Sequence, residues 1–211
     1  MDNREISHII AAILILTAVV GFAPALQNNW PEVSQAFLIS AIIILVSVFA
    51  KKTCAYLLDS DVEHELWKFS RYGLKPGQRF RTQVPGGIIF PLFFSLISLG
   101  ILKITTILTY ETRALKIRAA KRFGHYSYTE MTDWHTGLIG ASGILAMFIV
   151  AIISYFSNWE TLARIASYYA FWNMLPIAKF DGTQIFFGSR VLWSILAIIS
   201  LVFTGYALLL I

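Results

Sequence analysis

The sequence predicts an all-α, multi-pass integral membrane protein, and three observations indicate this fold class. Hydrophobic residues make up 57% of the 211 residues and charged residues only 14%, well below the roughly 25% that is typical of soluble domains. Four apolar stretches are long enough, or nearly so, to cross a hydrocarbon core about 30 Å thick. The chain has no internal repeat or low-complexity tract, so residues 1–211 are expected to form a single membrane domain.

The four apolar stretches are residues 9–26, 36–50, 137–156 and 191–211. The first is expected to be a retained helix, because Asp2, Arg4 and Glu5 give it no basic start of the kind that a secretory signal has. A shorter sixth segment, residues 165–177, contains Asn173 and is expected to end as a helix at Pro176, since proline breaks helices.

The fifth segment, residues 86–108, is predicted to enter the membrane and return to the same face. Pro91, Gly100 and Lys103 interrupt it, and basic stretches flank it on both sides. Thirteen of the 17 Lys and Arg residues lie between positions 51 and 122, a pattern typical of loops on the cytoplasmic side. A helix that simply crossed would place its two basic flanks on opposite faces, and this crossing helix is the alternative. Residues 79–84 (RFRTQV) alternate in polarity and predict a short strand, which a β-hairpin would accommodate.

The candidate functional site is the sequence WNMLPIAKFDG at residues 172–182. Asn173, Pro176, Asp181 and Gly182 lie together in or beside an apolar helix, where each of them is energetically costly. An ionisable residue within a membrane segment indicates a functional site by default. The alternative is a loop that ends the helix at the membrane surface and leaves Asp181 in water.

This motif resembles the Asn-x-x-Pro…Asp-Gly motif of the site-2 proteases, which are intramembrane zinc metalloproteases. The resemblance covers residues 36–203, with Asn173, Pro176, Asp181 and Gly182 as its specific part. It implies a site-2-protease-like helical core, and it implies that Asp181 stands where the family has its third zinc ligand. The Gly-rich helix of that family corresponds to residues 134–150, without the Pro and Asn of the family signature.

The other two zinc ligands of the family come from a His-Glu-x-x-His motif, which places both imidazoles on one helical face and supplies Glu as the general base. The full motif is absent, because no two of the four histidines are four residues apart. One remnant is His64-Glu65, followed by Lys68 where the second His belongs. This remnant lies in a charged stretch that is expected to be a solvated surface segment.

The favoured remnant lies instead at the end of the second apolar stretch, where Ser47 and Lys51 replace both histidines and Val48 replaces the glutamate. The family arrangement then implies that residues 173–182 pack against residues 47–51. Lys51 and Asp181 are expected to form an ion pair there, with an ammonium group in place of the metal.

The leading hypothesis is a catalytically inactive site-2-protease homologue that binds a transmembrane helix or a partner protein. It expects no cofactor, and its partners are the lipid bilayer and such a helix. One alternative is an active intramembrane zinc metalloendopeptidase that uses His64, Glu65 and Asp181; zinc is expected only in that case. A second alternative is a small transporter or channel. Nucleic acid is not expected as a partner, because no binding motif accompanies the basic residues.

Overall fold

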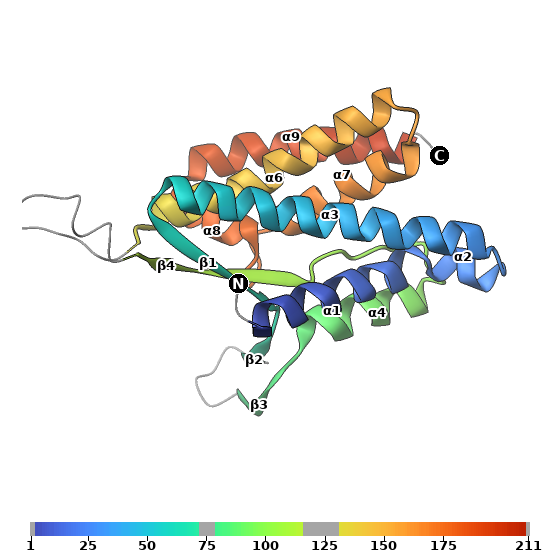
Figure 1. The fold of residues 1–211 in the computed structure, drawn as a ribbon, viewed down its shortest axis with the longest axis horizontal. Helices are drawn as coiled ribbons and strands as arrows, with labels where there is room; N and C mark the ends of the chain where they lie inside the picture. The colour runs from blue at the N-terminus through green and yellow to red at the C-terminus, as the bar shows by residue number, and fades with distance from the viewer. Residues whose placement is uncertain (1–2, 72–78, 116–130, 210–211) are drawn as a thin grey trace, which may run out of the picture.

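The computed structural model describes residues 3–71, 79–115 and 131–209, and its architecture is mostly helical (Figure 1). Part of each predicted basic stretch, residues 51–81 and 111–133, lies outside the described residues. The elements are α1 (Asn3–Val20), α2 (Phe22–Leu26), α3 (Trp30–Leu57), β1 (Ser60–Leu66), β2 (Phe69–Arg71), β3 (Arg79–Val84), α4 (Gly86–Ile97), β4 (Leu108–Ala114), α6 (Asp133–Phe156), α7 (Glu160–Met174), α8 (Asp181–Gly188) and α9 (Arg190–Leu209).

Four of the described helices, α1, α3, α6 and α9, are long and apolar enough to cross a membrane. They overlap the four stretches predicted from the sequence, although the first stretch is divided after Val20 into α1 and α2. The prediction of a mostly helical chain with four helices long and apolar enough to span a membrane is confirmed. Their outward faces carry large apolar side chains such as Phe49, Ile149 and Leu201, which are 58–72% exposed. Such an extensive apolar exterior is unusual for a soluble protein.

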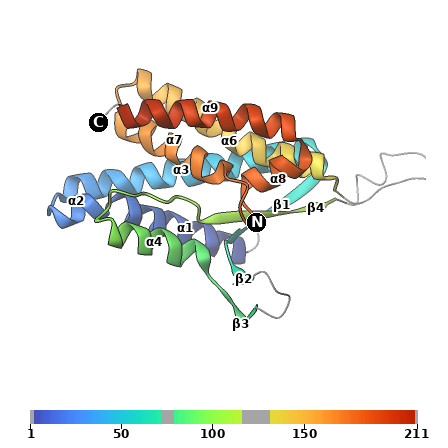
Figure 2. The same cartoon turned by 180° about the vertical axis from the view of Figure 1, so that it is seen from behind.

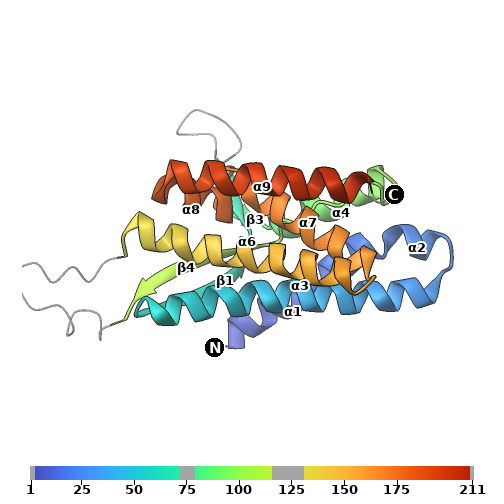
Figure 3. The same ribbon diagram turned by 90° about the horizontal axis from the view of Figure 1, so that it is seen from above.

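α3 lies between α1 and α6 (Figure 1), and Figure 3 shows α3, α6 and α9 running alongside one another. α6 also packs against α7 and α8, and α7 packs against α9. One apolar core runs through these contacts, and Leu16, Ile44, Ile144 and Ile165 are fully buried in it. α3 is therefore the central element, because α1 packs against it on one side and α6 on the other.

Residues 86–108 run away from the strands and back again, which is the chain path that the predicted re-entrant element requires; its re-entry into a membrane stays a prediction. α4 runs 12 residues away from the strands, and the chain then reverses at Leu99 and Gly100, both with positive φ. The backbone of Trp67 joins the two ends of this element, because its carbonyl accepts a hydrogen bond from Gly87 N–H and its own N–H donates to the Ile107 carbonyl, each at 2.9 Å. The segment thus begins and ends at the same end of the molecule (Figure 2).

Two small antiparallel sheets qualify the all-α prediction. β2 pairs with β3, so the predicted strand at residues 79–84 is present and forms a hairpin. β1 pairs with β4 over seven residues each, from Ser60 opposite Ala114 to Leu66 opposite Leu108. The sequence did not predict this second sheet, because the charged residues of β1 are typical of a solvated surface segment. Its polarity alternates along the strand, with Val62, His64 and Leu66 buried.

Candidate functional site

The candidate site is built on the break between α7 and α8. α7 ends at Met174, and Leu175 has the extended conformation (φ −63°, ψ 132°) that a following proline favours. The chain turns over the exposed Pro176 and begins α8 at Asp181. A side chain at Gly182 would place its Cβ 2.0 Å from the Met174 carbonyl oxygen. Glycine at this position is therefore what allows α8 to fold closely back on the end of α7.

Asp181 and Lys51 form an ion pair in the interior of the helical layer. Lys51 Nζ donates a hydrogen bond to Asp181 Oδ1 at 2.8 Å and lies 2.6 Å from Oδ2. The two side chains are 3% and 1% exposed. This is the contact that the sequence predicted between the end of the second apolar stretch and the Asp-Gly motif, and the structure contains it.

α6 makes room for the Lys51 side chain through its glycines. A Cβ on Gly143 would lie 2.5 Å from Lys51 Cε, and a Cβ on Gly140 would lie 2.6 Å from the Tyr110 hydroxyl. The Lys51 ammonium lies 4.9 Å from the centre of the Tyr110 ring, and the Tyr110 hydroxyl donates to the Thr136 carbonyl at 2.8 Å. Lys51 is thus enclosed by one carboxylate, one aromatic ring and a glycine-lined helix face.

Asn173, the other polar residue of the motif, is buried nearby and binds within α7. Asn173 Nδ2 donates to the Tyr169 carbonyl, one turn earlier in α7, at 2.9 Å. The Tyr169 hydroxyl is 3.4 Å from Ser47 Oγ, one turn before Lys51 in α3. α3 and α7 are therefore joined by a tyrosine–serine contact at the position where the family motif would place its first histidine.

A second buried polar cluster, which the sequence did not predict, joins Glu5, Lys52 and His64. Lys52 Nζ lies 2.9 Å from each carboxylate oxygen of Glu5. Glu5 Oε1 also accepts from the His64 backbone N–H at 3.2 Å and contacts His64 Nδ1 at 3.1 Å. The only sequence signal was an acidic residue at the start of an apolar helix. The cluster ties α1, α3 and β1 together.

His64 is held as a neutral imidazole in this cluster. Burial lowers the pKa of His64 to about 4, and the nearby Lys51 ammonium adds to this effect. Its Nε2 has no hydrogen-bond partner among the residues that the structure describes. Glu65, the next residue, points to the opposite face of β1 and is exposed, as expected from strand alternation. The structure therefore does not bring Glu65 to His64 and Asp181.

The residues at this site do not fit a catalytic zinc ion. The one carboxylate, Asp181, is already neutralised by Lys51, and an ammonium group cannot ligate a cation. Among the described residues, no three His, Cys, Asp or Glu side chains are grouped as metal ligands. A zinc hydrolase needs about three protein ligands with one open position.

None of the known protein families, curated proteins or solved structures compared with this chain matches it. The site-2 protease resemblance thus rests on the sequence motif at residues 173–182.

Proposed function

We propose that this chain is a multi-pass integral membrane protein with a site-2-protease-like core, and that it binds a transmembrane helix without cleaving it. The observation that carries this proposal is the Lys51–Asp181 ion pair. It joins the two motif positions at which the proteases would hold their metal, and it fills that place with an internal cation.

Two requirements of zinc hydrolysis, a free carboxylate ligand and Glu65 as general base, are not met at this site. Lys51 takes up the carboxylate that would serve as a ligand, and Glu65, the general base of the alternative hypothesis, is exposed on the other face of β1. The ion pair instead stabilises the helix packing, because Lys51 and Asp181 neutralise each other and either one alone would be an uncompensated buried charge. On this proposal the ion pair has a structural role, and the activity of the protein is the binding of a transmembrane helix.

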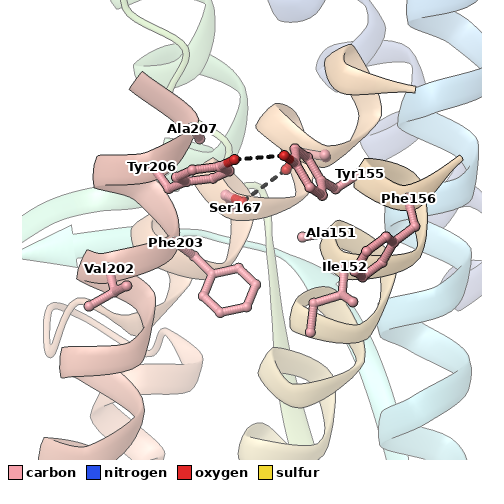
Figure 4. A pocket seen from close by; sticks show the side chains of 10 residues that line it. Ala151, Ile152, Tyr155, Phe156, Ser167, Val202, Phe203, Tyr206 and Ala207 are labelled. Atoms are coloured by element: carbon pink, nitrogen blue, oxygen red, sulfur yellow. Dashed lines mark hydrogen bonds between the residues drawn. The ribbon is translucent and has the colours of Figure 1, made fainter. Parts of the chain in front are cut away.

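A groove between α6, α7 and α9 supports the binding of a helix (Figure 4). It has a volume of about 250 Å³, and small residues of all three helices line it, including Ala151, Ala163 and Ala207. Small residues allow transmembrane helices to approach closely. Ala151 lies eight residues beyond Gly143 on α6, about 12 Å along the helix, so the groove is separate from the buried ion pair.

The orientation proposed for the protein follows from its basic residues. The described Lys and Arg residues of segment 51–113 gather mainly near the strands, which favours a cytoplasmic position for that end. The groove lies at the opposite end of α6, where the Tyr155 and Tyr206 hydroxyls hydrogen-bond to each other at 2.8 Å. Tyrosines at this depth are typical of the membrane–water boundary.

Photo-crosslinking in native membranes tests helix binding. Val202 lines the groove and its neighbour Leu201 does not, although both are well exposed on α9. A photoreactive residue at position 202 should give adducts with single-pass membrane proteins, and the same residue at position 201 should give lipid adducts only. Adducts with lipid alone at both positions would contradict helix binding.

The absence of catalysis is tested on purified protein by metal content and by cleavage of a reporter membrane helix. We expect less than one zinc per chain and no cleavage that depends on His64 or Glu65. Near one zinc per chain, with cleavage abolished by Glu65→Gln, would support the active metalloendopeptidase instead.

A further inference from the structure

A second pocket, of about 360 Å³, lies at the end of the molecule where α2 meets the turn after α4. The two elements are in close contact, because a Cβ on Gly100 would lie 2.8 Å from Ala23 Cβ. Six of its eleven lining residues are polar or charged, namely Gln27, Glu32, Gln35, Lys103, Thr161 and Arg164. This lining sets it apart from the apolar groove in Figure 4.

Lys103 is the key residue of this polar pocket. Its side chain is only partly exposed, and within the described ranges it makes no hydrogen bond or ion pair. Arg164 lines the same pocket, so two cations lie in its wall. A half-buried ammonium beside a second cation is unfavourable unless an anion compensates it.

The pocket supplies little negative charge of its own. Glu32 is the single carboxylate in its lining, against two cations, and Glu32 Oε1 already accepts a hydrogen bond from Asn29 Nδ2 at 2.6 Å. Arg164 has an interaction partner of its own, so Lys103 is the cation that an anion would engage first.

Two helix starts add to the positive potential. Glu32 and Gln35 lie near the start of α3, and Thr161 and Arg164 near the start of α7. Helix N-termini carry unpaired N–H groups and a partial positive charge that favours anions. The cations and the two helix starts together favour one negatively charged group.

We propose that this polar pocket binds a phosphate group, with Lys103 as its main contact and Gln27, Gln35 and Thr161 as hydrogen-bonding partners for the rest of the ligand. Its volume lies in the range of small-molecule sites and exceeds what a bare ion needs. The same phosphate chemistry is offered by an anionic phospholipid headgroup and by free phosphate. The pocket opens at one end of the apolar helices, where headgroups lie.

The experiment measures thermal stability and ligand binding of the full-length protein in detergent. Native mass spectrometry and the unfolding midpoint are recorded with added phosphatidylglycerol, with inorganic phosphate, and with diacylglycerol, which has no phosphate. We expect phosphatidylglycerol to bind at least about tenfold more tightly than diacylglycerol and to raise the midpoint.

Lys103→Met should lower the affinity for phosphatidylglycerol by about tenfold or more, while Lys103→Arg should retain most of it. The matched control is Lys179→Met, which removes an exposed lysine elsewhere and should leave binding unchanged. Because Lys103→Met removes an uncompensated charge, its ligand-free midpoint should not fall. This outcome separates lost binding from lost folding.

The comparison of the three ligands also distinguishes a lipid headgroup from free phosphate. Tighter binding of phosphatidylglycerol than of inorganic phosphate assigns the pocket to a lipid headgroup, and equal affinities assign it to free phosphate; both support a phosphate site. Equal binding of diacylglycerol, or binding that Lys103→Met leaves unchanged, would overturn the proposal.

Discussion

Breaking the buried ion pair between Lys51 and Asp181 should strongly destabilise the fold. The charges are 2.6 Å apart and the side chains are at most 3% exposed, so the gross attraction is about 6 kcal/mol at an effective dielectric constant of about 20. Removing one partner of a buried pair leaves the other charge uncompensated, at a cost of about 3–5 kcal/mol. Lys51→Met and Asp181→Asn should each lower the free energy of unfolding by this amount.

The double variant distinguishes an ion pair from two independent packing effects. With both charges removed, neither residue is uncompensated, so Lys51→Met/Asp181→Asn should cost several kcal/mol less than the sum of the single changes. The assay is denaturant unfolding of the purified protein in detergent for the parent, both single variants and the double variant.

An exposed ion pair of the same chemistry is the control. Lys179 Nζ lies 2.9 Å from Glu111 Oε1, but the two side chains are 66% and 53% exposed. Lys179→Met should change the free energy of unfolding by no more than about 1 kcal/mol. Additive effects of Lys51→Met and Asp181→Asn, or single effects as small as this control, would refute the reasoning.

Three further predictions concern pH, packing and topology. Because the pKa of His64 falls from 6.5 to about 4 on folding, stability should decrease as the pH drops from about 6.5 to 4, by up to about 3 kcal/mol; pH-dependent unfolding should show this loss, and His64→Gln should abolish it. Gly182→Ala should cost about 1–3 kcal/mol in unfolding experiments, because its Cβ would collide with backbone, whereas Gly205→Ala, with nothing within 4 Å, should not destabilise. Single cysteines at Asp61 and Arg113, which face each other across β1 and β4, should label from the cytoplasmic side of sealed vesicles in a cysteine-free background. Labelling of both from the other side would contradict the proposed orientation, and labelling from two different sides would contradict the re-entrant path of residues 86–108.

The sequence predicted those features whose signals are local. The four long helices follow from runs of apolar residues, and the reversal in residues 86–108 follows from Gly100 and from the position of the basic flanks. The Lys51–Asp181 contact was expected only from the motif resemblance, which implied that residues 173–182 pack against residues 47–51. Whether the groove between α6, α7 and α9 binds a helix stays a prediction.

The features that were missed depend on contacts between distant residues. β1 pairs with a strand about 50 residues away, and its charged residues obscured the alternation that buries Val62 and Leu66. Glu5 meets Lys52 and His64 across 47 and 59 positions. The pattern of residues in a short stretch of sequence does not reveal such a cluster, because the charges compensate one another only after the chain has folded.

The adjacent residues Lys51 and Lys52 constrain how the length of α3 can vary between related proteins. Lys51 binds Asp181 on one side of α3, and Lys52 binds Glu5 on another. Each residue added to an α-helix turns the remainder of that helix by about 100°. A one-residue insertion or deletion in the middle of α3 would therefore rotate both lysines out of register with their carboxylates, unless α1 and α8 shifted to match. Homologues should therefore tolerate substitutions on the outer face of α3 far more readily than changes in its length.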